Sequence, residues 1–284
     1  MVSPRPASIL LLLEEALAVH GARLGALSER ARSGGDDDLV HDVRVALRRV
    51  EALGRLFRGV PGEGDGEAVR GAARDLRRRL SLLRSEEVGR ALLAARPDAA
   101  GAGVEALLFP GGLPAVRVDV SEIGPVEGEL AGWRRRLVSV SNGAFAPRAG
   151  IEALLVRRTL RRLRNRGAEL SALLPPGRKT LHPARIAAKK LRYALEAVEP
   201  LDPGTRPLLR LLRSFQDAAG DAHDLGELAA RVRSAAGSRP ELEPLLRGLD
   251  SDATTAFGAA RRRAVALAAP VRRLSPALGR HRTR

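Results

Sequence analysis

Two segments of this sequence carry the same chemically active residues at the same spacing. The first begins at His41 and the second at His182, and an arginine follows three positions later, at Arg44 and Arg185. Basic residues occupy the seventh and eighth positions after each histidine: Arg48, Arg49, Lys189 and Lys190. Guanidinium groups form paired hydrogen bonds with phosphate oxygens, and ammonium groups add compact positive charges. The repeated pattern therefore indicates recognition of a phosphate-like anion.

Projected at about 100° per residue, each segment forms a helix with one basic and one apolar face. The first basic face holds His41, Arg44, Arg48 and Arg55. The second holds His182, Arg185, Lys189 and Tyr193, with Arg192 at its edge. Many surface helices have a basic solvent face, so one copy would carry little weight. The repetition favours a binding surface for a linear polyanion. In the free protein the surrounding cations should keep the histidines largely neutral, and a bound polyanion should raise their pKa.

Two further groups of arginines could extend this surface. One group contains Arg77, Arg78 and Arg84, and the other contains Arg157, Arg158, Arg161 and Arg162. Solvated helix faces in an arginine-rich protein would look the same, so both interpretations stay open for these residues.

The composition restricts the class of protein. The 284 residues carry a net charge of +16, which favours an acidic partner. The chain contains 44% hydrophobic but only 2% aromatic residues, so leucine, alanine and valine must build the core and an all-α fold is expected. Cysteine is absent, which excludes disulfides and thiolate chemistry. A phosphate-binding loop is also absent, and cations flank both histidines, so we expect no catalytic residue, no metal and no cofactor.

Helical periodicity and turn residues divide the chain into elements. We expect helices at about 8–32, 36–58, 67–95, 129–140, 148–174, 180–199, 205–219, 221–236 and 240–268, with Ser85 as a candidate interruption of the third. A glycine- and proline-rich connector at 96–128 should hold a short extended piece at 115–120 or a brief helix, and a basic tail should follow from 270 to 284. The apolar run at 9–13 is too short to span a membrane, so a cytoplasmic protein is expected.

The segments 39–49 and 181–193 resemble the two signature helices of the CHAD domain, whose name denotes conserved histidines and an α-helical fold. Gln216, Asp217, Gly220, His223 and Asp224 resemble a later helix of that family. The resemblance covers residues 5–270. It implies two pseudo-symmetric four-helix bundles, at about 5–140 and 148–268, with a basic groove or pore between them.

The resemblance also implies a function and a set of residues. Family members bind inorganic polyphosphate and associate with polyphosphate granules in bacteria. The binding residues that carry over are His41, Arg44, Arg48, Arg49, His182, Arg185, Lys189, Lys190, Arg192 and Tyr193. Arg84-Ser85-Glu86-Glu87 stands where the family often has Arg-Asp-Leu-Asp, which weakens the assignment of Arg84.

Two other partners remain open from the residues alone. RNA or DNA also presents phosphates to an arginine-rich surface, at least as a non-specific competitor, although residues for base stacking are scarce. A helical scaffold that binds acidic protein tails is the third possibility. The sequence does not determine the oligomeric state.

Overall fold

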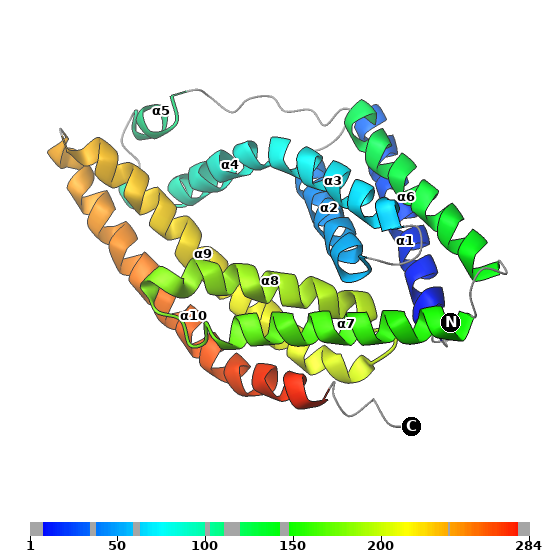
Figure 1. The fold of residues 1–284 in the computed structure, drawn as a ribbon. Coiled ribbons are helices and arrows are strands. Elements are labelled where there is room, and N and C mark those ends of the chain that lie inside the picture. Colours follow the sequence, from blue (N-terminus) through cyan, green and yellow to red (C-terminus); the bar gives the residue numbers. More distant parts are fainter. Residues whose placement is uncertain are drawn as a thin grey trace.

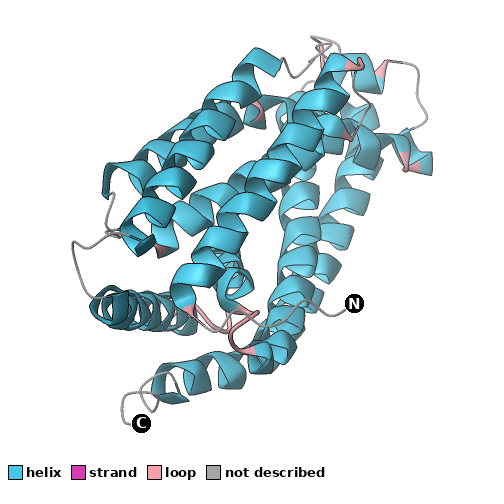
Figure 2. Cartoon of the chain, turned by 90° about the vertical axis from the view of Figure 1, so that its right-hand side faces the viewer, coloured by secondary structure: helices cyan, strands magenta, loops and turns pink. Residues whose placement is uncertain are grey.

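The computed structural model describes residues 8–34, 38–58, 63–99, 103–110, 120–142, 148–237 and 239–277. Among these residues the side chains of 63–65, 81–87, 98, 120, 140–142, 148 and 275–277 are not described. The described chain consists of helices joined by short loops and contains no strand (Figure 2). The expected all-α fold is therefore confirmed.

Ten α-helices account for most of the described residues. They are α1 Ile9–Arg32, α2 Leu39–Leu56, α3 Glu63–Arg79, α4 Ser81–Ala94, α5 Val104–Leu108, α6 Val120–Asn142, α7 Arg148–Ser171, α8 Leu181–Val198, α9 Arg206–Ala236 and α10 Glu243–Ala277. Short 3₁₀ turns occur at Pro97–Ala99, Arg178–Thr180, Pro203–Thr205 and Pro240–Leu242.

The helices form two packed groups (Figure 1). In the first, α1 and α3 both pack on α2 and on α6, and leucines of α1 share the apolar core with the buried Trp133 of α6. In the second, α8 packs between α7 and α9, and α10 packs on both α7 and α9. The groups are joined where α2 contacts α8 and where α1 contacts α7, so a single core runs through both.

A smaller apolar cluster lies near the C-terminal end of α9, whereas the N-terminal half of this helix belongs to the larger core. Leu93 of α4 and Phe109 after α5 pack there against Leu228 and Val232 of α9. Gly89 explains the close approach of α4, because a Cβ at this position would lie 2.8 Å from the Cζ atom of the Phe109 ring. The helices α4 and α5 thus link the first group to the far end of the second (Figure 1).

Four expected element boundaries were wrong. The helix expected at 67–95 is divided at Leu80 into α3 and α4, and the helices expected at 205–219 and 221–236 form one continuous helix, α9. The helix α6 begins at Val120, within the expected connector, because Ile123, Val126 and Leu130 bury one face despite Pro125. The helix α10 extends to Ala277, so the expected tail is partly helical.

The rest of the connector is only partly described. It contains the brief helix α5, while residues 111–119, which include most of the expected extended piece, lie outside the described residues. No described helix has the length and apolar character needed to cross a membrane.

Candidate anion-binding site

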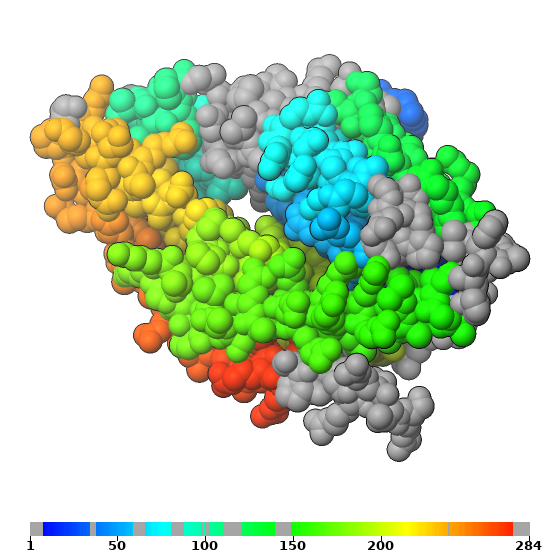
Figure 3. All heavy atoms as spheres, viewed as in Figure 1, coloured from blue at the N-terminus to red at the C-terminus, as the bar shows by residue number. Residues whose placement is uncertain are grey.

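The basic faces of α2 and α8 meet between the two helix groups. They line a cavity of about 1140 Å³ together with residues of α3, α4, α7 and α9. Figure 3 shows the molecule hollowed between the blue and cyan helices α2 and α3 and the yellow-green helices α8 and α9. Ten of the residues proposed from the sequence line this cavity: His41, Arg44, Arg48, Arg55, Arg77, Arg162, Arg185, Lys189, Lys190 and Tyr193.

The cavity also collects residues that the sequence did not assign to it. These are the basic residues Arg58, Arg70, Arg166, Arg231 and His223, and the carboxylates Glu51, Asp224 and Glu227. Twelve arginine and lysine side chains thus face three carboxylates. We call this space the basic cavity, because fixed positive charge dominates its wall and attracts anions.

The remaining candidates lie outside the lining. Arg49 and Arg192 both approach Glu196 of α8, with nitrogen–oxygen distances of 3.9 and 3.6 Å. Because Arg49 belongs to α2, this contact ties the two helix groups together. His182 is exposed and lies next to the cavity residue His223. Four arginines of α3 and α7 do not line the cavity either: Arg78, Arg157, Arg158 and Arg161.

Arg84 lies on α4, but its side chain is outside the described residues, so its assignment stays a prediction.

His20 of α1 lies near Arg49, and burial followed by the charge of Arg49 lowers the pKa of this histidine to about 4.

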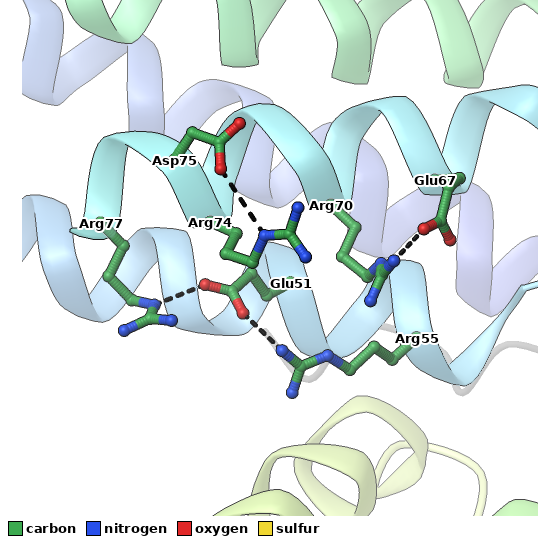
Figure 4. Close-up of polar contacts among 7 residues, drawn as sticks. All are labelled: Glu51, Arg55, Glu67, Arg70, Arg74, Asp75 and Arg77. Atoms are coloured by element: carbon green, nitrogen blue, oxygen red, sulfur yellow. Dashed lines mark hydrogen bonds and ion pairs between the residues drawn. The ribbon is translucent and has the colours of Figure 1, made fainter. Parts of the chain in front are cut away.

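Glu51 is a buried carboxylate in the wall of the basic cavity, with only 4% of its surface exposed. It accepts a hydrogen bond from the Nε atom of Arg77 on α3 and another, of 2.8 Å, from Nη2 of Arg55 (Figure 4). Arg74 and Arg70 lie along the same face of α3, and Arg70 pairs with Glu67 (Figure 4). Glu51 therefore neutralises and orients two cavity arginines from two different helices.

Glu169 has the corresponding role on α7. It accepts hydrogen bonds from Lys190, at 2.8 Å, and from Nη1 of Arg166, at 2.6 Å. Burial alone would raise the pKa of this carboxyl, but the two cationic donors lower it below its ordinary value. Lys190 and Arg166 are thus partly neutralised within the protein.

Two other cavity arginines hold helix ends in place. Arg44 is 8% exposed, and its Nη1 atom donates to the carbonyl of Leu80, where α3 ends. Arg162 of α7 donates to the carbonyls of Leu56 and Arg58 at the end of α2. Carbonyls at a helix end lack partners within the helix, so these arginines supply them. Both residues have a structural role that their spacing in the sequence did not indicate.

Three cations of the basic cavity stand apart from these pairs. Within the part of the chain that the structure describes, no carboxylate lies within 4.0 Å of Arg48, Arg185 or Lys189. At Lys189, burial followed by the positive charges of Arg48, Arg185, Arg192 and Arg44 lowers the pKa of the amine to about 7. Helices α2 and α8 therefore gather positive charge at one place, and the described residues supply no carboxylate counter-ion there.

Histidines from two helices meet beside these cations. The rings of His182 on α8 and His223 on α9 lie 4.9 Å apart, centroid to centroid. Burial, then the neighbouring His223 and Arg185, lowers the pKa of His182, although Glu227 acts in the opposite direction. The expectation of a largely neutral histidine thus agrees with the surroundings of His182.

Sequence spacing could have revealed part of what was missed. Arg70, which was missed, precedes the proposed Arg77 by seven positions, which places both on one face of α3. Glu51 precedes Arg55 by four positions, the spacing of a helical ion pair. Arg231 gave no such signal, because it reaches the cavity only through the packing of α9 against α4 and α5.

Comparison with known proteins adds two findings. A model of the CHAD domain matches residues 15–233 of this chain. The chain is also similar to the crystal structure of the CHAD domain from the plant Ricinus communis, at 21% sequence identity and a TM-score of 0.51. That match covers 100% of this chain and 95% of the plant chain, and at this identity it shows the fold alone. No curated protein matches the chain.

Proposed function

This chain belongs to the CHAD family, and from that premise we propose that it binds inorganic polyphosphate in the basic cavity without catalysing a reaction on it. Polyphosphate is a flexible chain of identical anionic units, so its recognition requires repeated cation contacts along a path. The cavity offers such contacts from α2, α3, α7, α8 and α9. A protein with this function would be found in the bacterial cytoplasm, on polyphosphate granules.

The observation that supports this proposal best is the group formed by Arg48, Arg185 and Lys189. A cation that has a carboxylate partner must give up that contact before it binds a phosphate. These three residues have no such partner among the described residues, so an incoming anion displaces no carboxylate, and at Lys189, with a pKa of about 7, it also favours the charged amine. Charge-assisted hydrogen bonds of this kind contribute about 1.5–3 kcal/mol each.

The wall of the cavity supports binding over catalysis. Both oxygens of its best-buried carboxylate, Glu51, already accept hydrogen bonds from arginines, so this group is engaged within the wall and is not presented to a ligand. Asp224 and Glu227 lie on α9, beside His223. We assign these groups to charge balance at the α9 side of the cavity.

Nucleic acid is the competing ligand, and the aromatic residues argue against it. Proteins that hold single strands stack bases on exposed aromatic rings. The aromatic lining residues are Phe109 and Tyr193, and both are buried. Arginines cover both rings, with Arg90 and Arg231 against Phe109 and Arg192 against Tyr193. Neither ring is presented to a base.

The proposal is tested by equilibrium binding of end-labelled polyphosphate of defined lengths at several salt concentrations. The variant Arg48→Gln/Lys189→Gln should bind on the order of 100-fold more weakly, because two charge-assisted contacts are lost. The matched control is Arg157→Gln/Arg161→Gln, which removes the same charge from exposed positions outside the cavity. It should bind within about threefold of the wild type, since distant exposed charges are screened.

Two outcomes would contradict the proposal. Equal losses in the cavity variant and the control would mean that binding is a general effect of the net charge of +16. Displacement of bound polyphosphate by single-stranded or duplex DNA of equal charge, at the same concentration, would favour nucleic acid as the ligand.

A further inference from the structure

The chain has only three lysines, and their surroundings differ. Lys179 lies on the exposed 3₁₀ turn before α8, away from the basic cavity. Lys190 is engaged by Glu169, with a nitrogen–oxygen distance of 2.8 Å. Lys189 lines the cavity and has no carboxylate within 4.0 Å among the described residues. The chain thus provides one exposed lysine and two that line the cavity, of which only Lys190 is paired with a carboxylate among the described residues.

Two neighbours of Lys189 suit a phosphate group. Arg48 of α2 and Arg185 of its own helix line the basic cavity beside it. Guanidinium groups bind phosphate dianions through paired hydrogen bonds. With a volume of about 1140 Å³, the basic cavity has space for a small phosphate ester or anhydride beside the amine.

An amine acts as a nucleophile only when it is neutral. Burial and the surrounding arginines lower the pKa of Lys189 to about 7, so much of this amine is neutral near neutral pH. An ordinary lysine, with a pKa near 10.4, is almost wholly protonated there. The same arginines therefore provide the phosphate site and help to lower the pKa of the amine. A bound phosphate offsets their charge, but burial, the largest cause of the lowered pKa, remains.

We propose that Lys189 is a modification site that takes acyl groups from small acyl phosphates, whose phosphate is held by the arginines of the basic cavity. The lone pair of the Lys189 amine attacks the carbonyl carbon and forms a C–N bond. The bond between that carbon and the bridging oxygen breaks, and inorganic phosphate leaves with the electron pair. The amine proton passes to the departing phosphate. The product is an uncharged amide at Lys189.

This inference needs only the cavity and a phosphate group. It does not rest on polyphosphate as the natural ligand, so the two proposals can fail independently.

The test uses the full chain and acetyl phosphate at neutral pH, with acetylation of each lysine followed by peptide mass spectrometry. Lys189 should be acetylated at least about tenfold faster than Lys179 and Lys190, because its neutral fraction is larger. Saturating inorganic phosphate should slow the reaction at Lys189 and leave Lys179 unaffected. The variant Lys189→Arg should lack the fastest acetylation event in the intact-mass time course.

A neutral reagent, N-acetoxysuccinimide, separates phosphate binding from amine reactivity. The preference for Lys189 over Lys179 should fall when this reagent replaces acetyl phosphate. Arg185→Gln should reduce the acetyl phosphate reaction at Lys189, whereas Arg157→Gln, outside the cavity, should not. The proposal is overturned if acetyl phosphate modifies all three lysines at similar rates, or if inorganic phosphate does not protect Lys189.

Discussion

Arg48 of α2 and Lys189 of α8 line the same cavity, and Arg48 is the cation that contributes most to lowering the pKa of Lys189. The two residues are far apart in the sequence and meet only because α2 packs on α8. Like charges brought together in this way repel each other and destabilise the folded chain. A protein that keeps such a contact accepts a stability cost at the place where an anion would relieve it.

This repulsion predicts that Lys189→Met stabilises the protein while it weakens anion binding. The substitution removes a buried charge and keeps the length of the side chain. At pH 6–7 the melting temperature should rise by at least about 2 °C, since 1 kcal/mol corresponds to about 2–4 °C in a chain of similar size. Thermal unfolding measures the first effect, and polyphosphate titration measures the second.

The stabilisation by Lys189→Met should depend on pH in a defined window. The folded pKa of Lys189 is about 7, below its ordinary value of 10.5. Between these values the unfolded chain binds more protons, so this group makes the wild type more stable as the pH rises. The advantage of the methionine variant should be complete below pH 7 and fade towards pH 10.5. Lys179→Met, at an exposed site, should change little at any pH.

Glu51→Gln should destabilise the fold. The neutral glutamine leaves Arg55 and Arg77 without the buried carboxylate that holds them. Such a change lowers the free energy of unfolding by about 2–4 kcal/mol in comparable cases. Chemical denaturation measures the free energy of unfolding. Glu29→Gln is the control, because the Glu29–Arg32 pair is exposed and should contribute less than about 1 kcal/mol.

The Glu51→Gln variant also tests whether the freed arginines bind anions. Added polyphosphate should raise the melting temperature of this variant more than that of the wild type, because a ligand that binds only the folded state stabilises it. Equal shifts in both proteins would place Arg55 and Arg77 outside the binding surface.

Local periodicity was sufficient for some features of this protein. The basic faces of α2 and α8 could be predicted because residues three, four and seven positions apart share one side of a helix, whatever lies around it. The all-α fold followed from a core that had to be built from leucine, alanine and valine. The turn at Leu80 and the continuity of α9 through Gly220 could not be predicted, because packing against other helices decides them.

The roles within the site also depended on tertiary contacts. Arg44 and Arg48 are equivalent in the sequence pattern, yet Arg44 is buried against the end of α3 and Arg48 has no carboxylate partner among the described residues. The same holds for Lys189 and Lys190, which are adjacent in the chain but differ because Glu169 of α7 reaches only Lys190. The pattern located the cations, and the fold decided which of them are available.

The difference between Arg44 and Arg48 leads to another prediction. Arg44→Ala should lower the free energy of unfolding by about 1–3 kcal/mol, because the carbonyl of Leu80 loses a buried donor. Arg48→Ala should leave stability unchanged or raise it, yet weaken polyphosphate binding about tenfold. Arg48→Glu should weaken binding further, since repulsion adds to the lost contact. Similar stability losses in Arg44→Ala and Arg48→Ala would contradict these separate roles.

His182 should report binding through its protonation. In the free protein, burial and the neighbouring His223 and Arg185 hold the pKa of His182 below 6.5. A polyanion in the cavity would screen these cations and favour the imidazolium, so the pKa should rise and binding should take up protons. Affinity should therefore increase as the pH falls from the pKa of His182 in the complex to its pKa in the free protein. Titration of the histidine ring signals by NMR, with and without polyphosphate, measures both pKa values. The buried His20, with a pKa of about 4, is the internal reference, and its signal should not respond. An unchanged pKa at His182 would mean that the anion binds away from the α8–α9 side of the cavity.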